Sequence, residues 1–388
     1  MQDEARIAYF GPPNSSLHRQ ADFSIPLSNM EFSDEYLMNE ILKAERRGIV
    51  LDGLLTWRDG NVLPVAKVAA RLGLACPEPS LLEVTAKKSN FRGFLNDHLG
   101  QDTQTLVRHR ALDQGMTRSQ FAACIEDLFS SAVSALILKP DRGSCSYLVL
   151  EVRSRADLDR AWDHYVQHSC YRGGAFILEE KLIGRECSVE TLCNDAGEIV
   201  QMWITEYMEG RKGEFWERGH FVPHEFSNLE EMKILKLARE IHHKLQLRNI
   251  ATHLEIILPE DCAPGVVEFN ARLAGDLTQE LFRLATGESM YHLTARMALG
   301  LRLEPRPYFS REQYNHCALI EFANPALRRR QNFLQAELET PDDLLCILDA
   351  DQSTDKNNDS RPGFTLLVGK TRSALEGRSH SVLNAAFE

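Results

Sequence analysis

The chain has 388 residues, of which 43% are hydrophobic and 26% are charged, and its formal net charge is −12 at pH 7. A chain of this length is expected to fold into two or three domains. The acidic balance argues against nucleic acid as a partner, because surfaces that bind nucleic acid are usually basic. No apolar run reaches the roughly 18 residues of a membrane helix, and the charged N-terminus has no signal-peptide core, so we expect no membrane contact and a cytoplasmic location.

The nine cysteines are odd in number and scattered, and no C-x-x-C pair occurs among them. We therefore expect reduced, mostly buried thiols rather than disulfides or zinc ligands. This usage is typical of a protein from a reducing compartment.

The first 112 residues alternate short apolar runs with segments of helical periodicity. Such alternation predicts βα units on a partly parallel sheet. The strands are expected at residues 7–10 and 49–56, and the helices at residues 34–47 and 62–72. Gly11 does not begin a dinucleotide fingerprint, because G-x-G-x-x-G is absent, so this region offers little chemistry by itself.

A basic helix is predicted over residues 85–99. Lys88 and Arg92 are four residues apart in it and therefore share a face. Basic residues on a helix are usually solvated, and contact with a bound anion is the functional alternative.

A buried strand over residues 132–139 ends in Lys139, and a polar turn containing Ser144 and Ser146 leads to a strand over residues 147–152. Such a turn can enclose phosphates with backbone N–H groups while the lysine supplies charge. The Walker pattern is absent, so a plain β-hairpin with a solvated turn remains the alternative.

The middle of the chain predicts further strands around two connecting segments. The exposed backbone after residue 180 is a place where a flat base can bind, although an ordinary crossover has the same pattern. The charged segment 208–217 can act as a lid. The strands are expected at residues 175–180, 187–193, 198–207 and 218–222.

The β-prone segments THLEIIL and GVVEFN, separated by the turn-forming PEDCAP, predict an antiparallel hairpin. A symmetric register places Leu258 opposite Gly265 and Glu255 opposite Glu268, with Asn270 on the same face as Glu268. Two carboxylates facing each other at about 4.5–5.5 Å repel unless a cation lies between them. Carboxylate and amide oxygens suit Mg²⁺, and a solvated surface hairpin is the alternative.

The C-terminal part predicts a small α+β structure. Helices are expected at residues 277–284 and 289–299, strands at residues 316–322 and 363–368, and a polar loop at residues 349–361. The basic run at residues 328–330 is interpreted as a solvated face.

Taken in chain order, these motifs resemble the ATP-grasp superfamily of carboxylate–amine ligases. The resemblance is carried by K-x-x-x-R, a strand ending in Lys-Pro before a Ser/Gly turn, EEKLIGRECSVE, and E…E-x-N-x-R. It covers roughly residues 49–300. The segment GHFVP at residues 219–223 is similar to a G-H-x-x-P stretch of the branch that joins amino acids into dipeptides, the L-amino acid ligases.

The resemblance implies an ATP-grasp fold of mixed α/β and α+β class. We expect an N-terminal βα (pre-ATP-grasp) domain at residues 1–112 and a small lid domain at residues 113–180. A larger α+β domain with a C-terminal extension is expected at residues 181–388.

The resemblance also implies the roles of individual residues, which suit phosphoryl transfer because that chemistry depends on positioning and charge neutralisation. Lys88 and Lys139 would bind the phosphates of ATP together with the turn that contains Ser144 and Ser146. The backbone of Glu179 and Leu182 would bind adenine, and Glu186 would bind ribose. Glu255, Glu268 and Asn270 would bind two Mg²⁺ ions, with Mn²⁺ as an alternative. Arg272 would stabilise the transferred phosphoryl group or the acyl phosphate, and Lys139 and His220 are the other expected catalytic residues.

The implied reaction activates a carboxylate with ATP to an acyl phosphate, which an amine then converts to an amide. The substrates would be an amino acid or small carboxylic acid and an amine acceptor, with His220, Arg272, Trp216 and Tyr207 as candidates for the pocket lining. Another ATP-grasp substrate class, and a nucleotide-binding sensor without ligase activity, are the alternatives. A homodimer is the default expectation.

The sequence departs from the family pattern at three places. The turn at residues 141–148 has one glycine where relatives have two or three. His253 stands where some relatives have a phosphate-contacting arginine, and Ala271 replaces a more usual proline. None of these changes removes a metal ligand or lysine, so we expect an active enzyme.

Overall fold

The structure is a computed structural model that describes residues 6–11, 20–27, 31–99, 106–130, 133–143, 146–171, 174–210, 215, 217–260, 263–306, 308–322, 345–349 and 363–387. The predicted site residue Ser144, the pocket candidate Trp216 and the run at residues 328–330 lie outside these ranges. Within the described ranges, no helix is long and apolar enough to cross a membrane.

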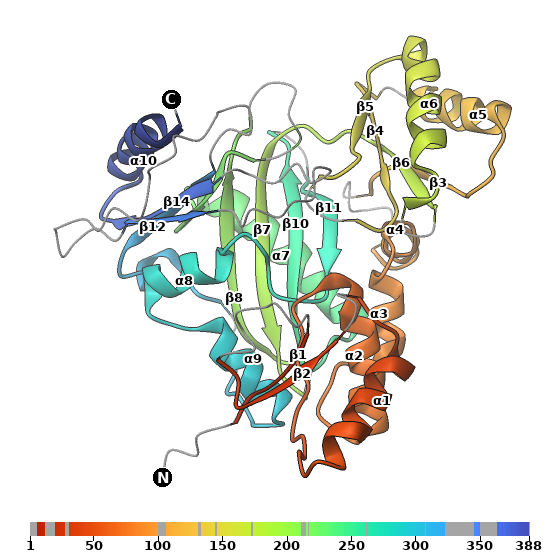
Figure 1. Cartoon of the computed structure of the whole chain (residues 1–388). Helices are drawn as coiled ribbons and strands as arrows, with labels where there is room; N and C mark the ends of the chain where they lie inside the picture. Colours follow the sequence, from red (N-terminus) through yellow and green to blue (C-terminus); the bar gives the residue numbers. More distant parts are fainter. Residues whose placement is uncertain are drawn as a thin grey trace.

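A large eight-stranded sheet, with the strand order β11-β10-β7-β8-β9-β12-β14-β13, forms the centre of the molecule (Figure 1). Each neighbouring pair is antiparallel. Helix α7 packs on one face of the sheet, and helices α8 and α9 pack on the other. The elements are β7 (Arg185–Cys193), β8 (Ile199–Met208), β9 (Gly219–Val222), α7 (Asn228–Leu245), β10 (Ile250–Leu258), β11 (Gly265–Asn270), α8 (Thr278–Thr286), α9 (Met290–Ala298), β12 (Cys317–Phe322), β13 (Leu345–Asp349) and β14 (Gly363–Gly369).

A smaller four-stranded sheet, with the order β3-β6-β4-β5, lies beyond the β11 edge of the large sheet (Figure 1). Its helices pack through aromatic side chains, as in the contact of Tyr165 with Phe176 at 5.8 Å between ring centroids. Strand β3, which ends at residue 112, pairs with β6 in this sheet. The expected domain boundaries at residues 112 and 180 stay predictions. The elements are β3 (His109–Leu112), α5 (Arg118–Phe129), β4 (Leu136–Pro140), β5 (Leu150–Val152), α6 (Leu158–His168) and β6 (Phe176–Glu180).

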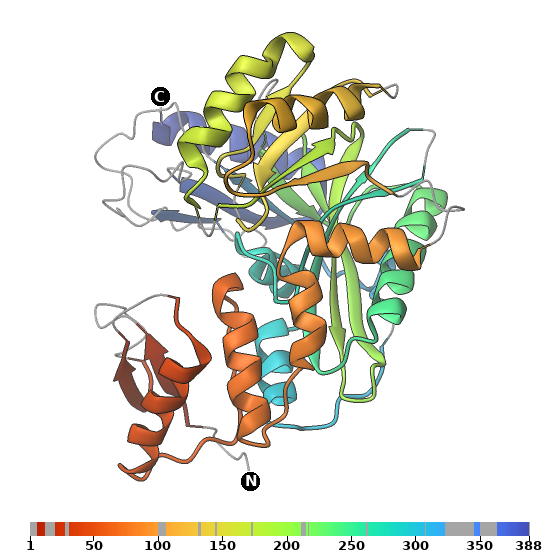
Figure 2. The same ribbon diagram turned by 90° about the vertical axis from the view of Figure 1, so that its right-hand side faces the viewer.

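The described residues up to residue 98 form a two-stranded parallel sheet and the helices α1–α4. Figure 2 shows α4 between helices α1–α3 and the four-stranded sheet. The strand predicted at residues 49–56 is wrong, because these residues form no strand. Gly53 lies instead against the end of α9, where a Cβ would be 2.4 Å from the carbonyl oxygen of Ala298. The elements are β1 (Ala8–Gly11), β2 (Phe23–Pro26), α1 (Asp34–Glu45), α2 (Asp59–Arg71), α3 (Pro79–Thr85) and α4 (Lys88–His98).

The helix predicted over residues 85–99 is divided, because α3 ends at Thr85 and α4 begins at Lys88. The cause is a distant cap. Asp141 accepts hydrogen bonds from the backbone N–H of Lys88 through its carbonyl oxygen at 3.0 Å and from that of Ser89 through its carboxylate at 2.7 Å. Such bonds satisfy N–H groups that have no partner within the helix.

The hairpin register is confirmed at the two glutamates, since Glu255 pairs with Glu268. The predicted pairing of Leu258 with Gly265 is wrong, because Ile257 pairs with Gly265. A β-bulge beside the glutamates shifts the register and leaves Val267 without a partner on β10. The carbonyl oxygen of Val267 is thereby available to side chains from outside the sheet.

The predicted strands at residues 316–322 and 363–368 are confirmed as β12 and β14, which pair antiparallel. Two C-terminal elements were not predicted, namely β13 and the helix α10 (Arg372–Phe387). Helix α10 packs through Leu375 against residues of β8, β9, β12 and β14. It therefore belongs to the same folded unit as the large sheet.

Candidate active site

A cavity of 1320 Å³, which we call the large cavity, lies between the four-stranded sheet and the large sheet. Its lining includes every predicted site residue that the structure describes. These are Lys88, Lys139, Ser146, Glu179, Leu182, Glu186, His220, Glu255, Glu268, Asn270 and Arg272. Residues that are up to 184 positions apart in the chain thus converge on one space, which no single motif could show.

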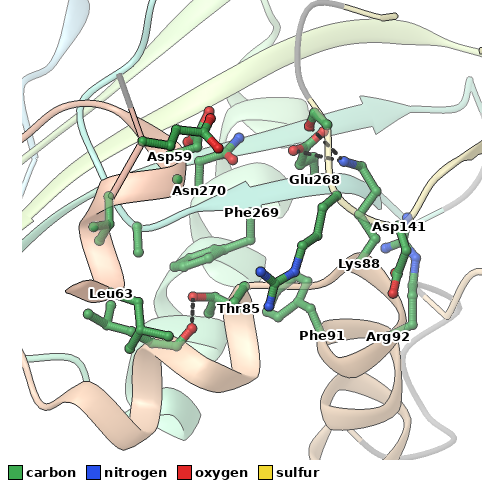
Figure 3. A pocket seen from close by; sticks show the side chains of 18 of the residues that line it. Asp59, Leu63, Thr85, Lys88, Phe91, Arg92, Asp141, Glu268, Phe269 and Asn270 are labelled. Carbon is green, nitrogen blue, oxygen red and sulfur yellow. Dashed lines mark hydrogen bonds and ion pairs between the residues drawn. The ribbon is translucent and has the colours of Figure 1, made fainter. Parts of the chain in front are cut away.

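The facing carboxylates Glu255 and Glu268 are each held by a different cation. Lys88 Nζ lies 3.1 Å from Glu268 Oε1, as Figure 3 shows. His253 Nε2 lies 3.1 Å from Glu255 Oε1. Burial raises the pKa of Glu255, but the hydrogen bond and charge of His253 outweigh it and lower that pKa. These cations relieve part of the repulsion across the hairpin.

His253 lies between two carboxylates in the large sheet. Its Nδ1 is 2.6 Å from Glu190 Oε1 on β7, and its Nε2 faces Glu255. Burial lowers the pKa of His253, but the charge and hydrogen bond of Glu190, together with Glu255, raise it to about 10. The histidine is therefore held between two carboxylates, which favour its protonated form.

The side chain of Glu179 has a role that the sequence reasoning missed. It is 4% exposed, and it accepts Arg92 Nε at 2.6 Å and Lys139 Nζ at 2.7 Å. Burial raises the pKa of Glu179, but the charges and hydrogen bonds of Arg92 and Lys139 lower it to about 2. Arg92 Nη2 and Lys139 Nζ also donate to the carbonyl oxygen of Val267, at 3.0 and 3.4 Å. The bulge in β11 thus orients the cations of two other elements.

The floor of the large cavity carries an excess of carboxylates. Burial raises the pKa of Glu186 to about 8, and the charges of Glu255 and Glu217 add to this effect, while Lys139 opposes it. In the described residues, no three His, Cys, Asp or Glu side chains form a metal-binding group. The hairpin itself offers the carboxylates of Glu255 and Glu268 and the amide oxygen of Asn270. These oxygen donors suit a hard cation that takes water or phosphate oxygens as further ligands.

Arg272 lies on the wall of the large cavity, where its guanidinium is bound by Asp59 of α2. Its Nε and Nη2 donate to the two carboxylate oxygens of Asp59, the second at 2.9 Å, and its Nη1 donates to the carbonyl oxygen of Leu273. Burial lowers the pKa of Arg272, but Asp59 and the charges of Glu268 and Glu255 raise it. The arginine is thus a cation held close to the paired glutamates.

His220 is buried at the side of the large cavity next to Tyr207, whose ring stacks on it at 4.4 Å between centroids. Its Nε2 lies 3.1 Å from Glu217 Oε1, and its Nδ1 lies 3.2 Å from Thr278 Oγ1 at the start of α8. Two of the predicted pocket-lining residues therefore form one aromatic wall.

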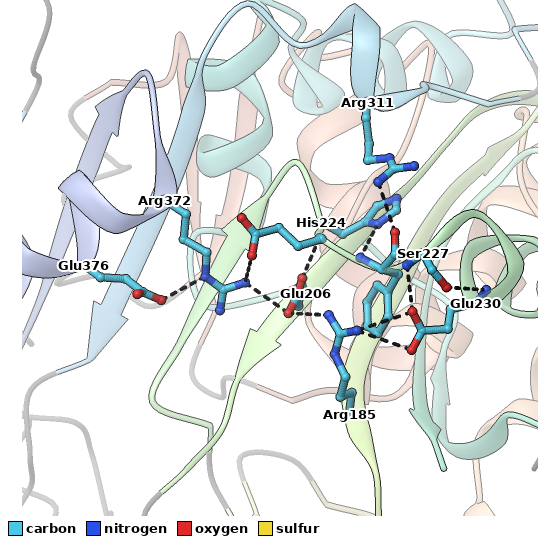
Figure 4. A network of polar contacts seen from close by, with 10 residues as sticks. Arg185, Glu206, His224, Ser227, Glu230, Arg311, Arg372 and Glu376 are labelled. Carbon is cyan, nitrogen blue, oxygen red and sulfur yellow. Dashed lines mark hydrogen bonds and ion pairs between the residues drawn. The ribbon is translucent and has the colours of Figure 1, made fainter. Parts of the chain in front are cut away.

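Ion pairs close the rim of the large cavity and connect it to the C-terminal helix (Figure 4). Glu206 on β8 is approached by Arg185 Nη2 at 3.0 Å and by Arg372 Nη1 at 3.1 Å. Arg372 also pairs with Glu225 and Glu376. This network, which the sequence did not indicate, fixes α10 against the cavity.

Comparisons with known proteins agree with this architecture. Residues 133–280 match the ATP-grasp domain family. Residues 133–280, less than half of the chain, therefore carry the similarity to ATP-grasp domains. This region contains Lys139, the EEKLIGRECSVE segment at residues 179–190 and the β10–β11 hairpin, and Lys88 precedes it.

The curated relatives that the chain matches are named as ligases. It is 26% identical over 290 residues to alanine–anticapsin ligase of Bacillus subtilis (strain 168), and 24% identical over 289 residues to that of Bacillus amyloliquefaciens. Each match covers 69% of this chain and 57% of the relative, so the alignment spans little more than half of the relatives' length.

Solved structures confirm the ATP-grasp fold. An L-amino acid ligase from Bacillus licheniformis superposes with a TM-score of 0.72 at 17% identity, covering 98% of this chain and 91% of that one. Phosphoribosylglycinamide synthetase from Anaerococcus prevotii gives 0.67 at 15% identity, covering 98% and 92%. The biotin carboxylase domain of a Hydrogenobacter thermophilus carboxylase gives 0.71 at 12% identity, covering 94% and 81%.

Proposed function

We propose that this ATP-grasp protein is an ATP-dependent ligase that joins a carboxylate to an amine and releases ADP and phosphate. One observation carries the proposal: Glu255 faces Glu268 across β10 and β11 in the same cavity that Lys88 and Lys139 enter. This combination of paired carboxylates and lysines suits a nucleotide triphosphate with its metal ions.

In the proposed complex, Lys88 and Lys139 bind the phosphates of ATP, and the turn containing Ser144 and Ser146 lies over them. Ribose is bound by Glu186, and adenine by the backbone of Glu179 and Leu182. The salt bridges of the lysines to Glu268 and Glu179 support these roles, because they keep the ammonium groups extended into the large cavity. Phosphate oxygens would compete for the same donors.

Enzymes of the superfamily use ATP with Mg²⁺ or Mn²⁺, and Glu255, Glu268 and Asn270 are the proposed ligands here. The residues fit a hard cation, since their donor atoms are all oxygens from two facing carboxylates and an amide. Two bound Mg²⁺ ions would neutralise the charge that develops on the phosphoryl oxygens.

The proposed chemistry has two steps. A carboxylate oxygen of the first substrate attacks the γ-phosphorus, and the bond to the bridging oxygen breaks, giving an acyl phosphate and ADP. The amine nitrogen of the second substrate then attacks the carbonyl carbon, phosphate leaves, and the amine loses a proton. Arg272 would stabilise the charged phosphoryl group, and His220 lies where it can hydrogen-bond the acyl phosphate or the amine.

The proposed substrates are an amino acid or small carboxylic acid and the amine of an amino acid, as in dipeptide or peptide-antibiotic synthesis. The names of the alanine–anticapsin ligases and of the L-amino acid ligase support this choice. The purine-pathway and carboxylase neighbours share the fold, so another ATP-grasp substrate class is the alternative. A cytoplasmic location and a homodimer remain predictions.

The test is to measure ADP release with Mg²⁺-ATP in the presence of amino acids and small acids, singly and in pairs. We expect at least one pair to stimulate ADP release and to yield an amide that mass spectrometry detects. Tight ATP binding without stimulation by any acid would instead support a nucleotide sensor.

A further inference from the structure

A second cavity of 360 Å³, which we call the small cavity, adjoins the large one beside the free edge of β11 (Figure 3). Helices α2, α3 and α4 form its other walls. Its volume lies within the roughly 300–1,000 Å³ of small-molecule sites. A cavity of this size between packed elements can therefore hold a small ligand.

The two cavities meet at the proposed catalytic groups. Lys88, Glu268 and Asn270 line both cavities, together with the bulge residue Val267. A ligand in the small cavity can therefore place one end beside the Lys88–Glu268 pair, where the phosphates of ATP would lie on the other side.

The junction has cationic groups with unused hydrogen-bonding capacity. Arg92 is 3% exposed, and its Nη1 has no hydrogen-bond partner among the described residues. Lys88 Nζ contacts Glu268 and also donates to the carbonyl oxygen of Gly143 at 3.1 Å. Arg142, the neighbour of Gly143, also lines the small cavity. The unused N–H donors of Arg92 and Lys88 can be satisfied by the oxygens of an anionic group on the ligand.

The remainder of the small cavity is largely apolar. Leu82, Phe91 and Phe269 line it and are nearly fully buried, with the two phenyl rings 5.1 Å apart between centroids. Leu63 and Ala86 complete this wall. Burial of an apolar ligand body against such side chains is favourable, because it removes apolar surface from water.

The acidic residues of the small cavity disfavour a second carboxylate on the ligand. Glu31 and Asp59 both line the cavity, and Asp59 is also paired with Arg272. A carboxylate in the ligand body would be repelled by these two side chains. The wall thus favours a body that carries no negative charge.

We propose that the small cavity binds the body of the carboxylate that is activated, and that this substrate is a monocarboxylic acid with an apolar body of the size of leucine or phenylalanine. The inference rests on the proposed ligase function, which it deepens by naming the substrate class. Its carboxylate lies at the junction beside Lys88, where it can attack the γ-phosphorus of ATP in the large cavity.

The kinetic test uses hydroxylamine as the amine, so that the acyl phosphate is trapped as a hydroxamate whatever the natural acceptor is. With the unmodified protein we expect kcat/KM to be at least about tenfold higher for leucine or phenylalanine than for glutamate. Ala86→Leu, which narrows the small cavity, should lower kcat/KM for phenylalanine about tenfold relative to alanine, and Leu63→Ala should shift preference toward larger acids. Ala295→Leu, an exposed helical change on α9 away from both cavities, is the matched control.

A binding experiment separates this inference from the proposed function. Phenylalanine is titrated into protein saturated with Mg²⁺ and a non-hydrolysable ATP analogue, and binding is measured by calorimetry for the unmodified chain and for Ala86→Leu. If phenylalanine binds to the unmodified chain and Ala86→Leu abolishes this binding, the result supports the inference. That support holds even if no acid stimulates ADP release. A lack of stimulation would overturn the ligase function alone. If Ala86→Leu and Leu63→Ala both turn over and prefer the same acids as the unmodified chain, the inference is overturned and the ligase function still stands.

Discussion

Asp59 and Arg272 form a two-point ion pair although 213 residues separate them in the chain. Asp59 is the first residue of α2, and Arg272 follows β11. The pair therefore connects the N-terminal helices to the hairpin that carries the proposed metal ligands. A planar guanidinium held at two points by a carboxylate has a defined orientation.

Asp59→Asn should release this orientation. We expect kcat to fall on the order of tenfold, equivalent to about 1.4 kcal/mol, because Arg272 would no longer be held toward the phosphoryl group. Affinity for Mg²⁺-ATP should change little. Steady-state kinetics and nucleotide titration check this, with Asp159→Asn in the first turn of α6 as a control, and an unchanged kcat would contradict it.

Glu268→Gln should abolish ligase turnover and leave the fold intact. The amide keeps the shape of the side chain but removes the charge that would bind the metal ion and that faces Lys88 at 3.1 Å. We expect ADP release to fall by a factor on the order of a thousand and Mg²⁺ affinity to weaken. ADP release, Mg²⁺ titration and thermal unfolding check this against Glu45→Gln on α1, and full activity would show that the metal assignment is wrong.

Glu179→Gln should be strongly destabilising. It leaves the buried cations Arg92 and Lys139 without their carboxylate, and breaking a buried pair costs about 3–5 kcal/mol of unfolding free energy. Glu126→Gln is the matched control, because Glu126 pairs with Arg155 on the surface and is 59% exposed, where pairs contribute roughly 0–1 kcal/mol. Denaturant unfolding should separate the two variants, and equal losses would refute this account of Glu179.

The stability of the fold should decrease in acid because of His242. This residue is buried in α7, and burial lowers its pKa to about 4 although the carbonyl oxygen of Ala238 partly opposes this. In the unfolded chain its pKa is about 6.5, so below that pH the unfolded state binds a proton that the folded state does not. The contribution is therefore complete above pH 6.5 and is lost as the pH falls to about 4.

At pH 5 this linkage amounts to roughly 2 kcal/mol of unfolding free energy. Denaturant unfolding at pH 7.5 and pH 5 checks the value. His242→Gln should reduce the loss of stability between these two pH values by about this amount, whereas His243→Gln, at an exposed neighbouring position, should leave the loss unchanged. The opposite pattern would show that another group is responsible.

Local patterns predicted most elements of the fold. The helices α1, α2, α8 and α9 and most strands of the large sheet follow from hydrophobic periodicity and turn residues, which act over a few neighbours. Failures occurred where distant groups intervened. Residues 49–56 cross the end of α9, and the start of α4 is set by Asp141, which is 52 residues away from the Ser89 it caps.

The candidate site shows the same division. Pattern and resemblance pointed to Glu255, Glu268, Lys88 and Lys139, because each lies in a short recognisable motif. The buried role of Glu179, the bulge at Val267 and the Asp59–Arg272 pair had no local signal, since each depends on elements far apart in the chain.

The sequence by itself determined the order of the motifs, the facing of Glu255 and Glu268, and the acidic, oxygen-rich chemistry of the hairpin, because strand alternation and residue type are local properties. Only the tertiary structure decided which cation holds each carboxylate and that a second, apolar cavity opens beside them. The physical reason is that ion pairing and cavity shape arise from the packing of helices α2–α4 against the edge of β11, over separations that no local pattern records.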